Sequence, residues 1–294
     1  MKSMVVAEGE RQVKLTNLDK VLYPESGYTK AHLLRYLSSV APHMLPHLKA
    51  RPLVMTRYPD GIHGKSFYQK NAPKTRPLGS QTFPFRHGSR QGPVEYFLAG
   101  DRVDLLWLGN LGCLEIHAWQ SRRGSIRHPD WSVFDLDPAP PAAYPEAVTG
   151  ALRLRELLKT VGLKGYAKTS GGKGVHVYVP LDPVHSYEDV TAWVWGVGRL
   201  LDRRFPGFFT LERAVKKRRG VYVDYLQNGL GRTMAAPYSP RPRPGAPVST
   251  PVTWDELERV SPGDLTLTTV LDLLNRRGDP FLPVLEGGQQ ITPQ

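Results

Sequence analysis

The stretch Trp131-Ser-Val-Phe-Asp-Leu-Asp-Pro138 indicates both a buried strand and the chemistry at its end. Alternate side chains of a strand share a face, so Asp135 and Asp137 point the same way while the apolar residues point into a core. Pro138 has no N–H to donate and is expected to end the ladder. Two neighbouring carboxylates repel each other unless a cation lies between them. Such oxygen ligands suit Mg²⁺ or Mn²⁺, and the alternative is a turn with two solvated acids.

The composition favours a globular protein with a polyanionic partner. The 294 residues suffice for one large domain or two modest ones, and Lys and Arg exceed Asp and Glu by 39 to 27, a formal charge of +12. Nucleic acid is the first partner that this excess suggests, although a merely basic protein is the alternative. The single cysteine, Cys113, excludes an intramolecular disulfide. No signal peptide and no membrane-spanning stretch of roughly 20 apolar residues is evident, so a cytoplasmic location is expected.

Helical and strand patterns are mixed without regular βαβ alternation, which predicts an α+β fold. Thr29 is expected to cap a helix from Lys30 to about Val40, and Pro42 to end it. The other expected elements are strands at 53–56, 94–98, 113–119, 132–136, 174–179 and 220–226, and helices near 144–160, 187–203, 254–260 and 265–276. The proline-rich stretch 237–247 is expected to be extended but is too short for a clear linker, so residues 1–294 are interpreted as one domain.

Two further segments carry candidate functional residues. Asp224 interrupts the expected strand 220–226, where a buried carboxylate needs a partner; a hydrogen-bonded structural aspartate is the alternative. If this strand lies beside Trp131–Pro138, three carboxylates converge. The segment Lys168-Thr-Ser-Gly-Gly-Lys-Gly-Val-His176 has glycines that permit a tight turn whose N–H groups can face an anion. It lacks the order of a Walker A loop, and an ordinary glycine hairpin is the alternative.

In this order, the segments resemble the archaeo-eukaryotic primase superfamily, and within it the polymerase domain of bacterial ligase D, which acts in non-homologous end joining. The paired-Asp motif of that family matches Asp135-Leu-Asp137, its S-G-x-x-G-x-H motif matches Ser170 to His176, and its downstream aspartate matches Asp224. The segments 15–24, 115–117, 224–228 and 237–249 also look like blocks of the family. The resemblance covers nearly the whole chain. It implies a primase-like fold with mixed or antiparallel central sheets flanked by helices.

The resemblance implies nucleotidyl transfer with two metal ions, Mn²⁺ or Mg²⁺. Asp135 and Asp137 would bind both ions, and Asp224 the ion nearer the primer 3′-OH. The residues that would bind the nucleoside triphosphate are His117, Ser170, Lys173, His176, Gln227 and Arg241. For Arg241 the alternative is a solvated arginine in a proline-rich loop, and for His117 a half-buried histidine with satisfied hydrogen bonds.

The resemblance also implies contacts with DNA. In relatives, residues that match Asn17, Lys20 and Lys30 hold a recessed 5′-phosphate, and a phosphate at the start of the helix would offset the unfavourable position of a lysine there. Aromatic residues that stack on template bases match Phe67 and Tyr68, beside Arg57. Thr56 stands where the family is expected to have a basic residue. In the basic run 216–219, Lys216 and Lys217 are expected to face DNA, or else to form a solvated charge cluster.

The expected function is therefore a DNA-end-processing nucleotidyltransferase of non-homologous end joining, a DNA-directed DNA/RNA polymerase. It would extend primers and fill gaps that carry a 5′-phosphate, using NTP or dNTP with a preference for ribonucleotides. One module accounts for the whole chain, so Ku and a separate DNA ligase are the expected partners, and an association with the nucleoid is expected. The alternatives are a primase that initiates chains on single-stranded DNA and a non-catalytic DNA-end-binding module. The presence of all three carboxylates argues against the latter.

Overall fold

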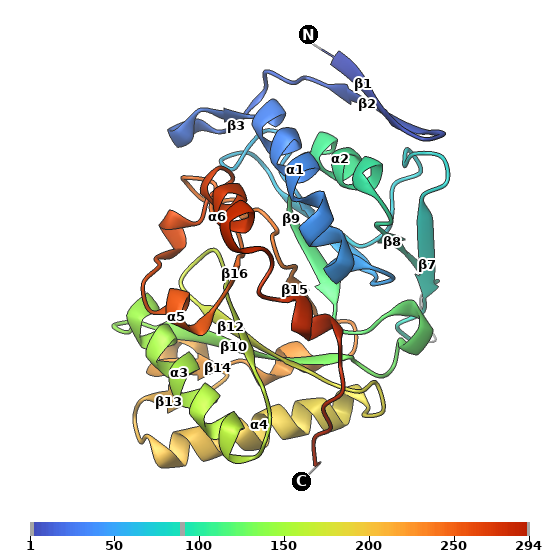
Figure 1. Ribbon diagram of the computed structural model, residues 1–294. Helices are drawn as coiled ribbons and strands as arrows, with labels where there is room; N and C mark the ends of the chain where they lie inside the picture. The colour runs from blue at the N-terminus through green and yellow to red at the C-terminus, as the bar shows by residue number, and fades with distance from the viewer. Residues whose placement is uncertain (1–2, 89–91, 293–294) are drawn as a thin grey trace. The chain divides into compact units, whose positions relative to one another are not determined.

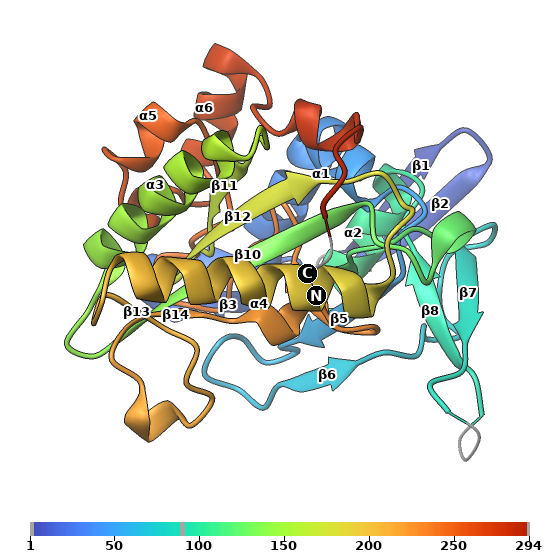
Figure 2. The ribbon, with the colours of Figure 1, turned by 90° about the horizontal axis from the view of Figure 1, so that it is seen from below.

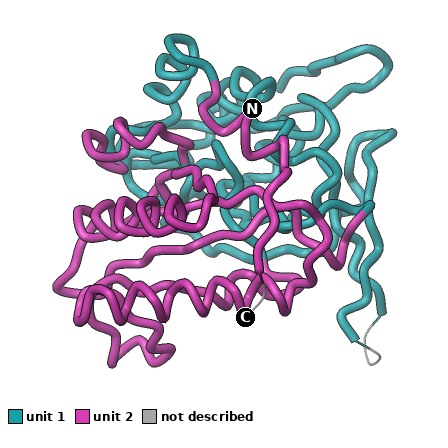
Figure 3. Tube along the Cα trace, turned by 60° about the horizontal axis from the view of Figure 1, so that its bottom comes forward, with its two compact units in different colours: residues 1–124, 233–249, 263–278 teal, residues 125–232, 250–262, 279–294 magenta. Residues whose placement is uncertain are grey.

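The computed structural model describes residues 3–88 and 92–292. The chain forms two compact units, each built from three segments (Figure 3). Unit 1 comprises residues 1–124, 233–249 and 263–278, and unit 2 comprises residues 125–232, 250–262 and 279–294. The chain passes from one unit to the other five times, so neither unit is a continuous piece of sequence. The single domain expected over residues 1–294 stays a prediction.

Unit 1 is built on an antiparallel sheet (Figure 1). Its strands lie in the order β15 (Thr233–Ala235), β9 (Cys113–Trp119), β5 (Leu53–Arg57), β8 (Val94–Leu98) and β7 (Gln81–Phe85), and β6 (Phe67–Gln69) also pairs with β5. The other elements are the hairpins β1 (Ser3–Glu8) with β2 (Arg11–Thr16) and β3 (Val21–Tyr23) with β4 (Tyr28–Thr29), and the helices α1 (Lys30–Leu48), α2 (Arg102–Asn110) and α6 (Thr269–Arg277). Helix α1 packs on α2, and α2 packs on β9.

Unit 2 is built on a second sheet whose neighbouring strands are antiparallel except for β13 and β14. Its strands lie in the order β13 (Phe209–Thr210), β14 (Gly220–Val223), β10 (Trp131–Ala139), β12 (Val175–Pro180), β11 (Tyr166–Thr169) and β16 (Pro251–Val252), and its helices are α3 (Tyr144–Thr160), α4 (Tyr187–Arg204) and α5 (Trp254–Leu257). Figure 2 shows α4 running alongside β10.

Helices α3 and α4 cover the same face of the unit 2 sheet. The ring of Trp193 in α4 packs edge-on against Phe134 of β10, with centroids 5.4 Å apart. Gly150 of α3 lies against Val221, and Gly198 of α4 lies against Val223, two residues of β14 that share a face. Phe134 and Leu136 therefore point toward the helices, as predicted, and the aspartates of β10 point to the opposite face.

The α+β prediction is confirmed, and β8, β9 and α3 have the predicted bounds. The predicted end of the first helix is wrong, because α1 continues through Pro42 and Pro46 to Leu48. A proline inside a helix costs about 3 kcal/mol. Val40, Met44 and Leu48 are fully buried, and their packing offsets that cost.

The prediction that Pro138 ends the ladder holds on one side of β10 only. The strand continues to Ala139, and Pro138 lies opposite Val221 of β14. The N–H of Asp224 donates to the carbonyl of Asp135 at 2.9 Å, so the backbone polar groups of Asp135 point toward β14. Because these groups alternate in direction along a strand, those of Pro138, three residues later, point toward β12. The ladder with β12 has already ended there, at Leu136.

Two predictions about the later part of the chain are wrong. The stretch 237–247 folds back on itself: Tyr238 and Ala246 have φ of 67° and 51°, and the N–H of Arg241 donates to the carbonyl of Pro247 at 2.8 Å. The predicted strand 220–226 ends at Val223 and is followed by the 3-10 helix Tyr225–Asn228. Helices α5 and α6 are shorter than expected, and Thr253 caps α5 by accepting from the N–H of Glu256 at 3.2 Å.

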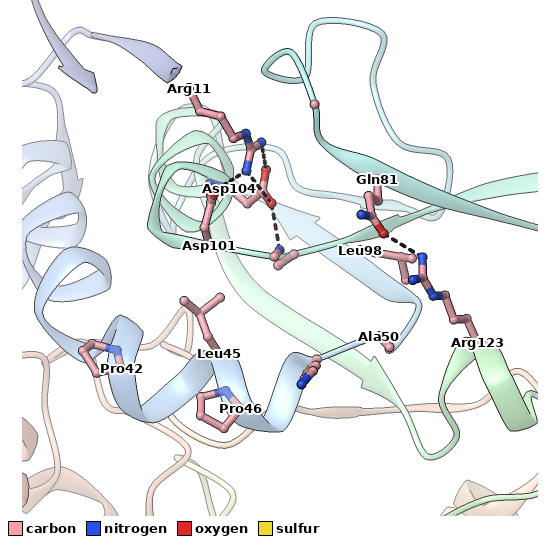
Figure 4. Close-up of a pocket in the computed structure, with 14 residues that line it drawn as sticks. Arg11, Pro42, Leu45, Pro46, Ala50, Gln81, Leu98, Asp101, Asp104 and Arg123 are labelled. Atoms are coloured by element: carbon pink, nitrogen blue, oxygen red, sulfur yellow. Dashed lines mark hydrogen bonds and ion pairs between the residues drawn. The ribbon is translucent and has the colours of Figure 1, made fainter. Parts of the chain in front are cut away.

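A buried ion pair fixes the β1–β2 hairpin to α2 (Figure 4). Asp104 is only 1% exposed and accepts from Arg11 Nη2 at 2.7 Å, Ser80 Oγ at 2.6 Å and the N–H of Gly100 at 2.8 Å. Arg11 also contacts Asp101, and its hydrogen bond with Asp104 raises the pKa of the guanidinium. Arg11, Asp101 and Asp104 line a groove of about 770 Å³, in which Arg11 pairs with both aspartates. Within the described ranges, no helix has the length and apolarity to cross a membrane.

Candidate active site

Two of the three predicted catalytic carboxylates lie on β10 of unit 2, and the third directly follows the neighbouring strand β14. Asp135 and Asp137 of β10 lie opposite His176 of β12 and Tyr222 of β14, respectively. Asp224 follows β14 directly, two residues after Tyr222, which places it on the same face as the other two acids. The condition on which their convergence depends, adjacency of the two strands, is therefore met.

Asp224 is a helix cap as well as a strand-end residue. Its Oδ1 accepts from the N–H of Leu226 at 3.2 Å and from the hydroxyl of Tyr222 at 3.3 Å. The predicted nucleotide-binding residue Gln227 places Nε2 3.5 Å from Asp224 Oδ2. Burial, followed by the charge of Asp224, raises the pKa of Tyr222 to about 12. The Tyr222 hydroxyl thus stays protonated beside the carboxylate.

The donor chemistry of this face suits a hard divalent cation, since all three candidate ligands are carboxylates. The glycine at 174 leaves space for one of them: a Cβ there would lie 2.8 Å from both Asp137 Oδ1 and the carbonyl oxygen of Leu136. Among the residues that the structure describes, no three or more His, Cys, Asp or Glu side chains are grouped to hold a metal ion. The binding of two ions by Asp135, Asp137 and Asp224 therefore stays a prediction.

A buried chain of polar groups contacts Asp135. His176 Nε2 lies 3.3 Å from Asp135 Oδ1, and Lys168 Nζ lies 2.8 Å from His176 Nδ1. All three side chains are buried, and Lys168 is fully inaccessible. Sequence reasoning gave Lys168 no role. Its partner His176 lies directly opposite on the neighbouring strand β12, and no local sequence signal identifies such a pairing.

The glycine loop 170–174 closes around the Ser170 hydroxyl. Ser170 Oγ accepts from the N–H groups of Gly172 and Gly174, each at 3.1 Å, and the Ser170 N–H donates to the carbonyl of Gly174 at 3.0 Å. Gly171 has a φ of 71°, in the left-handed region that favours glycine. Two N–H groups that were expected to face an anion are thus bonded to Ser170, whose own hydrogen remains for donation. The side chain of Lys173 is exposed beside the loop.

Unit 1 brings together the two other predicted triphosphate contacts. His117 Nε2 and Arg241 Nη2 lie 3.5 Å and 3.1 Å from the two carboxylate oxygens of Glu115. Burial tends to raise the pKa of Glu115, but contact with His117, the charge of Arg241 and a hydrogen bond from Thr56 outweigh it and lower that pKa. Glu115 lay within a recognised block but was given no role. Its alternation with His117 on β9 is the signal that could have identified it.

The two predicted stacking aromatics lie on opposite faces of β6, as consecutive strand residues do. Tyr68 pairs with Thr56 in register and its ring lies 6.1 Å from that of His117. Phe67 lies beneath the guanidinium of Arg57 at 4.8 Å. Both aromatic side chains are exposed, but only Tyr68 shares the face of His117 and Glu115.

The predicted 5′-phosphate residues lie around the start of α1. The carbonyl of Lys20 accepts a hydrogen bond from the N–H of Lys30, and the N–H of Lys20 donates to the carbonyl of Asn17. The side-chain Nζ of Lys20 lies 2.5 Å from Asp60 Oδ1. Lys30 is buried and its Nζ donates to the carbonyl of Asn110 at 2.8 Å. Burial lowers the pKa of Lys30, and the charges of Lys20 and Arg57 lower it further. The three cations are thus close enough to repel one another.

The predicted DNA-binding lysines of unit 2, Lys216 and Lys217, are exposed in the 3-10 helix Val215–Lys217. Arg218, which was not singled out within the basic run, instead stacks its guanidinium on Tyr222 at 3.5 Å. Since Tyr222 contacts Asp224, this arginine connects the basic segment to the carboxylate face.

Comparison with known proteins gives a consistent family. The LigD primase-polymerase domain model matches residues 29–281. The chain is 35% identical over 274 residues to the bifunctional non-homologous end joining protein LigD of Bacillus subtilis, covering 92% of this chain and 44% of that protein. It is 34% identical over 280 residues to the multifunctional LigD of Mycolicibacterium smegmatis, covering 94% of this chain and 36% of that protein. The chain therefore spans less than half the length of these relatives.

A solved structure shares the fold. The polymerase domain of Mycobacterium tuberculosis ligase D, in complex with DNA, superposes with a TM-score of 0.87 at 32% sequence identity, covering 95% of this chain and all of that one. The predicted primase-like fold is thereby confirmed. This chain belongs to the LigD primase-polymerase domain family, and the enzyme class that the sequence predicts, a nucleotidyltransferase, is that of the family.

Proposed function

We propose that this chain extends primers and fills gaps at broken DNA ends, adding NTP or dNTP with a preference for ribonucleotides. The observation that carries the proposal is the placement of Asp135, Asp137 and Asp224 on neighbouring strands, on the face that α3 and α4 leave uncovered. A polymerase needs such acids, since phosphoryl transfer is catalysed by positioning and charge neutralisation rather than by a protein nucleophile.

The three carboxylates would hold two Mn²⁺ or Mg²⁺ ions. When bound, such ions favour the deprotonated 3′-OH and stabilise the leaving pyrophosphate. His176 contacts Asp135, and the N–H of Leu226 and the hydroxyl of Tyr222 contact Asp224, so these groups orient two of the three ligands. Second-sphere contacts of this kind fix the direction of a ligand oxygen.

The triphosphate is assigned to the six predicted side chains, each of which is described within its own unit. In unit 2, Ser170 retains a hydrogen to donate, and Lys173 supplies an exposed ammonium. His176 and Gln227 lie next to the acids. In unit 1, His117 and Arg241 are the contacts, and a guanidinium can bind phosphate through two parallel hydrogen bonds.

The DNA is assigned to the basic and aromatic residues. Asn17, Lys20 and Lys30 would take a 5′-phosphate, which would relieve the mutual repulsion of the clustered cations. Tyr68 and Phe67 would stack on bases, with Arg57 nearby. Lys216 and Lys217 would contact the backbone and make binding sensitive to salt. Ku and a DNA ligase activity are the proposed partners, and the nucleoid the proposed place of action.

The test of the catalytic assignment is the Asp137→Ala variant on a gapped duplex with Mn²⁺. Nucleotide addition should be abolished while the affinity for the duplex changes little, since the affinity depends mainly on phosphate contacts. Undiminished addition by this variant would refute the assignment. A wild-type chain that binds DNA ends but adds no nucleotide under any of these conditions would instead favour the non-catalytic module.

The end-processing role is tested by comparing gaps with and without a 5′-phosphate. The wild type should prefer the phosphorylated gap, and Lys20→Ala should lose that preference while still extending a simple primer. An unchanged preference in Lys20→Ala would remove this residue from the phosphate site. Efficient initiation on a circular single strand would favour the primase.

A further inference from the structure

Glu115 connects two side chains, His117 and Arg241, that the proposed function assigns to the triphosphate. Its carboxylate contacts Arg241 Nη2 at 3.1 Å and His117 Nε2 at 3.5 Å, and it also accepts a hydrogen bond from Thr56. The Glu115 side chain is only 12% exposed, and those of His117 and Arg241 are 16% and 18% exposed. A carboxylate at this depth is kept ionised by its partners, in agreement with its lowered pKa.

The cluster leaves buried nitrogens without hydrogen-bond partners. Within the described part of the chain, neither Arg241 Nε nor His117 Nε2 has a hydrogen-bond acceptor, although both atoms are buried. The contact from Glu115 to His117 has the length of an ion pair rather than of a well-formed hydrogen bond. An unsatisfied buried polar group costs about 1–3 kcal/mol, so an acceptor that reaches these nitrogens would be stabilising.

These nitrogens call for an anionic acceptor that Glu115 alone does not supply. A guanidinium offers five N–H donors, and the two oxygens of one carboxylate are already divided among Arg241, His117 and Thr56. Phosphate oxygens would satisfy the remaining donors. A side chain that holds both His117 and Arg241 in place before the nucleotide arrives lowers the entropy lost on binding.

We propose that Glu115 is a positioning residue for the nucleotide: it holds Arg241 and His117 together, so that their remaining N–H groups are available to the triphosphate. The inference rests on the proposed function and extends it to a residue that makes no direct contact with the substrate. Its position in the strand supports the role, because Glu115 and His117 share one face of β9 and Thr56 lies directly opposite Glu115 on β5.

A positioning role and a simple charge effect predict opposite results. If Glu115 acted only through its charge, its loss would leave the site more positive and would strengthen binding of the triphosphate. If Glu115 positions His117 and Arg241, Glu115→Gln should raise the KM for nucleotide by about tenfold with kcat little changed, because an interaction present in both ground and transition states is lost. Glu115→Asp keeps the negative charge, but its side chain is one methylene shorter, so the carboxylate lies farther from Arg241 and His117. It should also raise KM under positioning and leave KM unchanged under the charge effect.

The experiment measures primer extension by the wild type, Glu115→Gln and Glu115→Asp, together with equilibrium binding of a non-incorporable nucleoside triphosphate with Mn²⁺. The matched control is Asp104→Asn, since Asp104 is another buried, arginine-paired carboxylate of unit 1 with no role in the proposed site. Its substitution should lower the free energy of unfolding without changing nucleotide affinity. In an Arg241→Met background, Glu115→Gln should add less than about a twofold effect, because coupled residues are not additive.

The outcomes separate the two proposals. Unchanged or tighter nucleotide binding by both Glu115 variants, with an active wild type, would overturn the positioning role and leave the polymerase intact. A wild type that neither binds nucleotide nor extends a primer would overturn the proposed function itself. If Glu115→Gln does not fold, Glu115→Asp and the binding measurement still decide between positioning and charge.

Discussion

Gly174→Ala tests how tightly the glycine loop is packed against the carboxylate strand. A Cβ at this position would lie 2.8 Å from Asp137 Oδ1 and 2.8 Å from the carbonyl oxygen of Leu136. Ordinary van der Waals contact begins at 3.4 Å, so each atom would have to move by about 0.6 Å. Leu136 cannot retreat easily, since it is paired with Val175 on one side and Val223 on the other. The loop and the Asp137 carboxylate must therefore move.

Two magnitudes follow from this displacement. Overpacking of one methyl group costs about 1–3 kcal/mol, which should appear as a lower free energy of unfolding in urea. A misplacement of about 1 Å at a reacting centre can cost about a hundredfold in rate, so a shift near half that size predicts a loss of about tenfold in kcat/KM. The assays are urea denaturation and steady-state extension of a primer in a gapped duplex.

The control is Gly263→Ala, where the added Cβ would meet nothing within 4 Å. That variant should keep the activity of the wild type, and its stability should be equal or slightly higher because alanine reduces the freedom of the unfolded chain. If Gly174→Ala shows the stability and kcat/KM of the wild type, then the loop does not constrain Asp137 and the reasoning fails.

Three further outcomes are expected. Arg11→Met should lower the free energy of unfolding by about 3 kcal/mol in urea, since it leaves Asp104 buried without its cation, although Asp104 keeps two other donors; a loss below about 1 kcal/mol would contradict this. Tyr68→Ala should weaken template binding by about 1–3 kcal/mol in fluorescence anisotropy, whereas Tyr68→Phe, which loses only the contact with Thr233, should bind normally. Because the folded-state pKa of Glu115 is lowered, its stabilisation is present above the usual carboxyl pKa and is lost as pH falls through the folded value. The stability difference between the wild type and Glu115→Gln should therefore shrink on acidification, and a difference independent of pH would argue against the ion pair.

Strand periodicity was the most reliable guide to the site. The alternation of Asp135 with Phe134 and Leu136 predicted a strand with acids on one face, and the register confirms that assignment. Local signals of this kind depend only on the geometry of one element. The adjacency of β10 and β14 was stated as a condition, because no local pattern specifies which strands become neighbours.

The misses have tertiary causes. The sequence predicts that the first helix ends at Pro42, because a proline removes a backbone donor. The buried contacts of the following turns outweigh that loss, and the helix continues. The turns at Tyr238 and Ala246 need positive φ at non-glycine residues, which no composition rule indicates. Glu115 and Lys168 were overlooked because each contacts a residue of a distant loop or of a neighbouring strand, and such partners are not visible in a single segment.

The repeated passage of the chain between its two units has a consequence for biosynthesis. Unit 1 lacks α6 until residues 263–278 have left the ribosome, and unit 2 lacks its last segment until residues 279–294 follow. Proteins whose domains are consecutive in sequence can complete the first domain during translation. Here the segments of the two units are interleaved, so neither unit can be completed before residues 263–278 have emerged, and deletion of residues 263–292 should disable both units together.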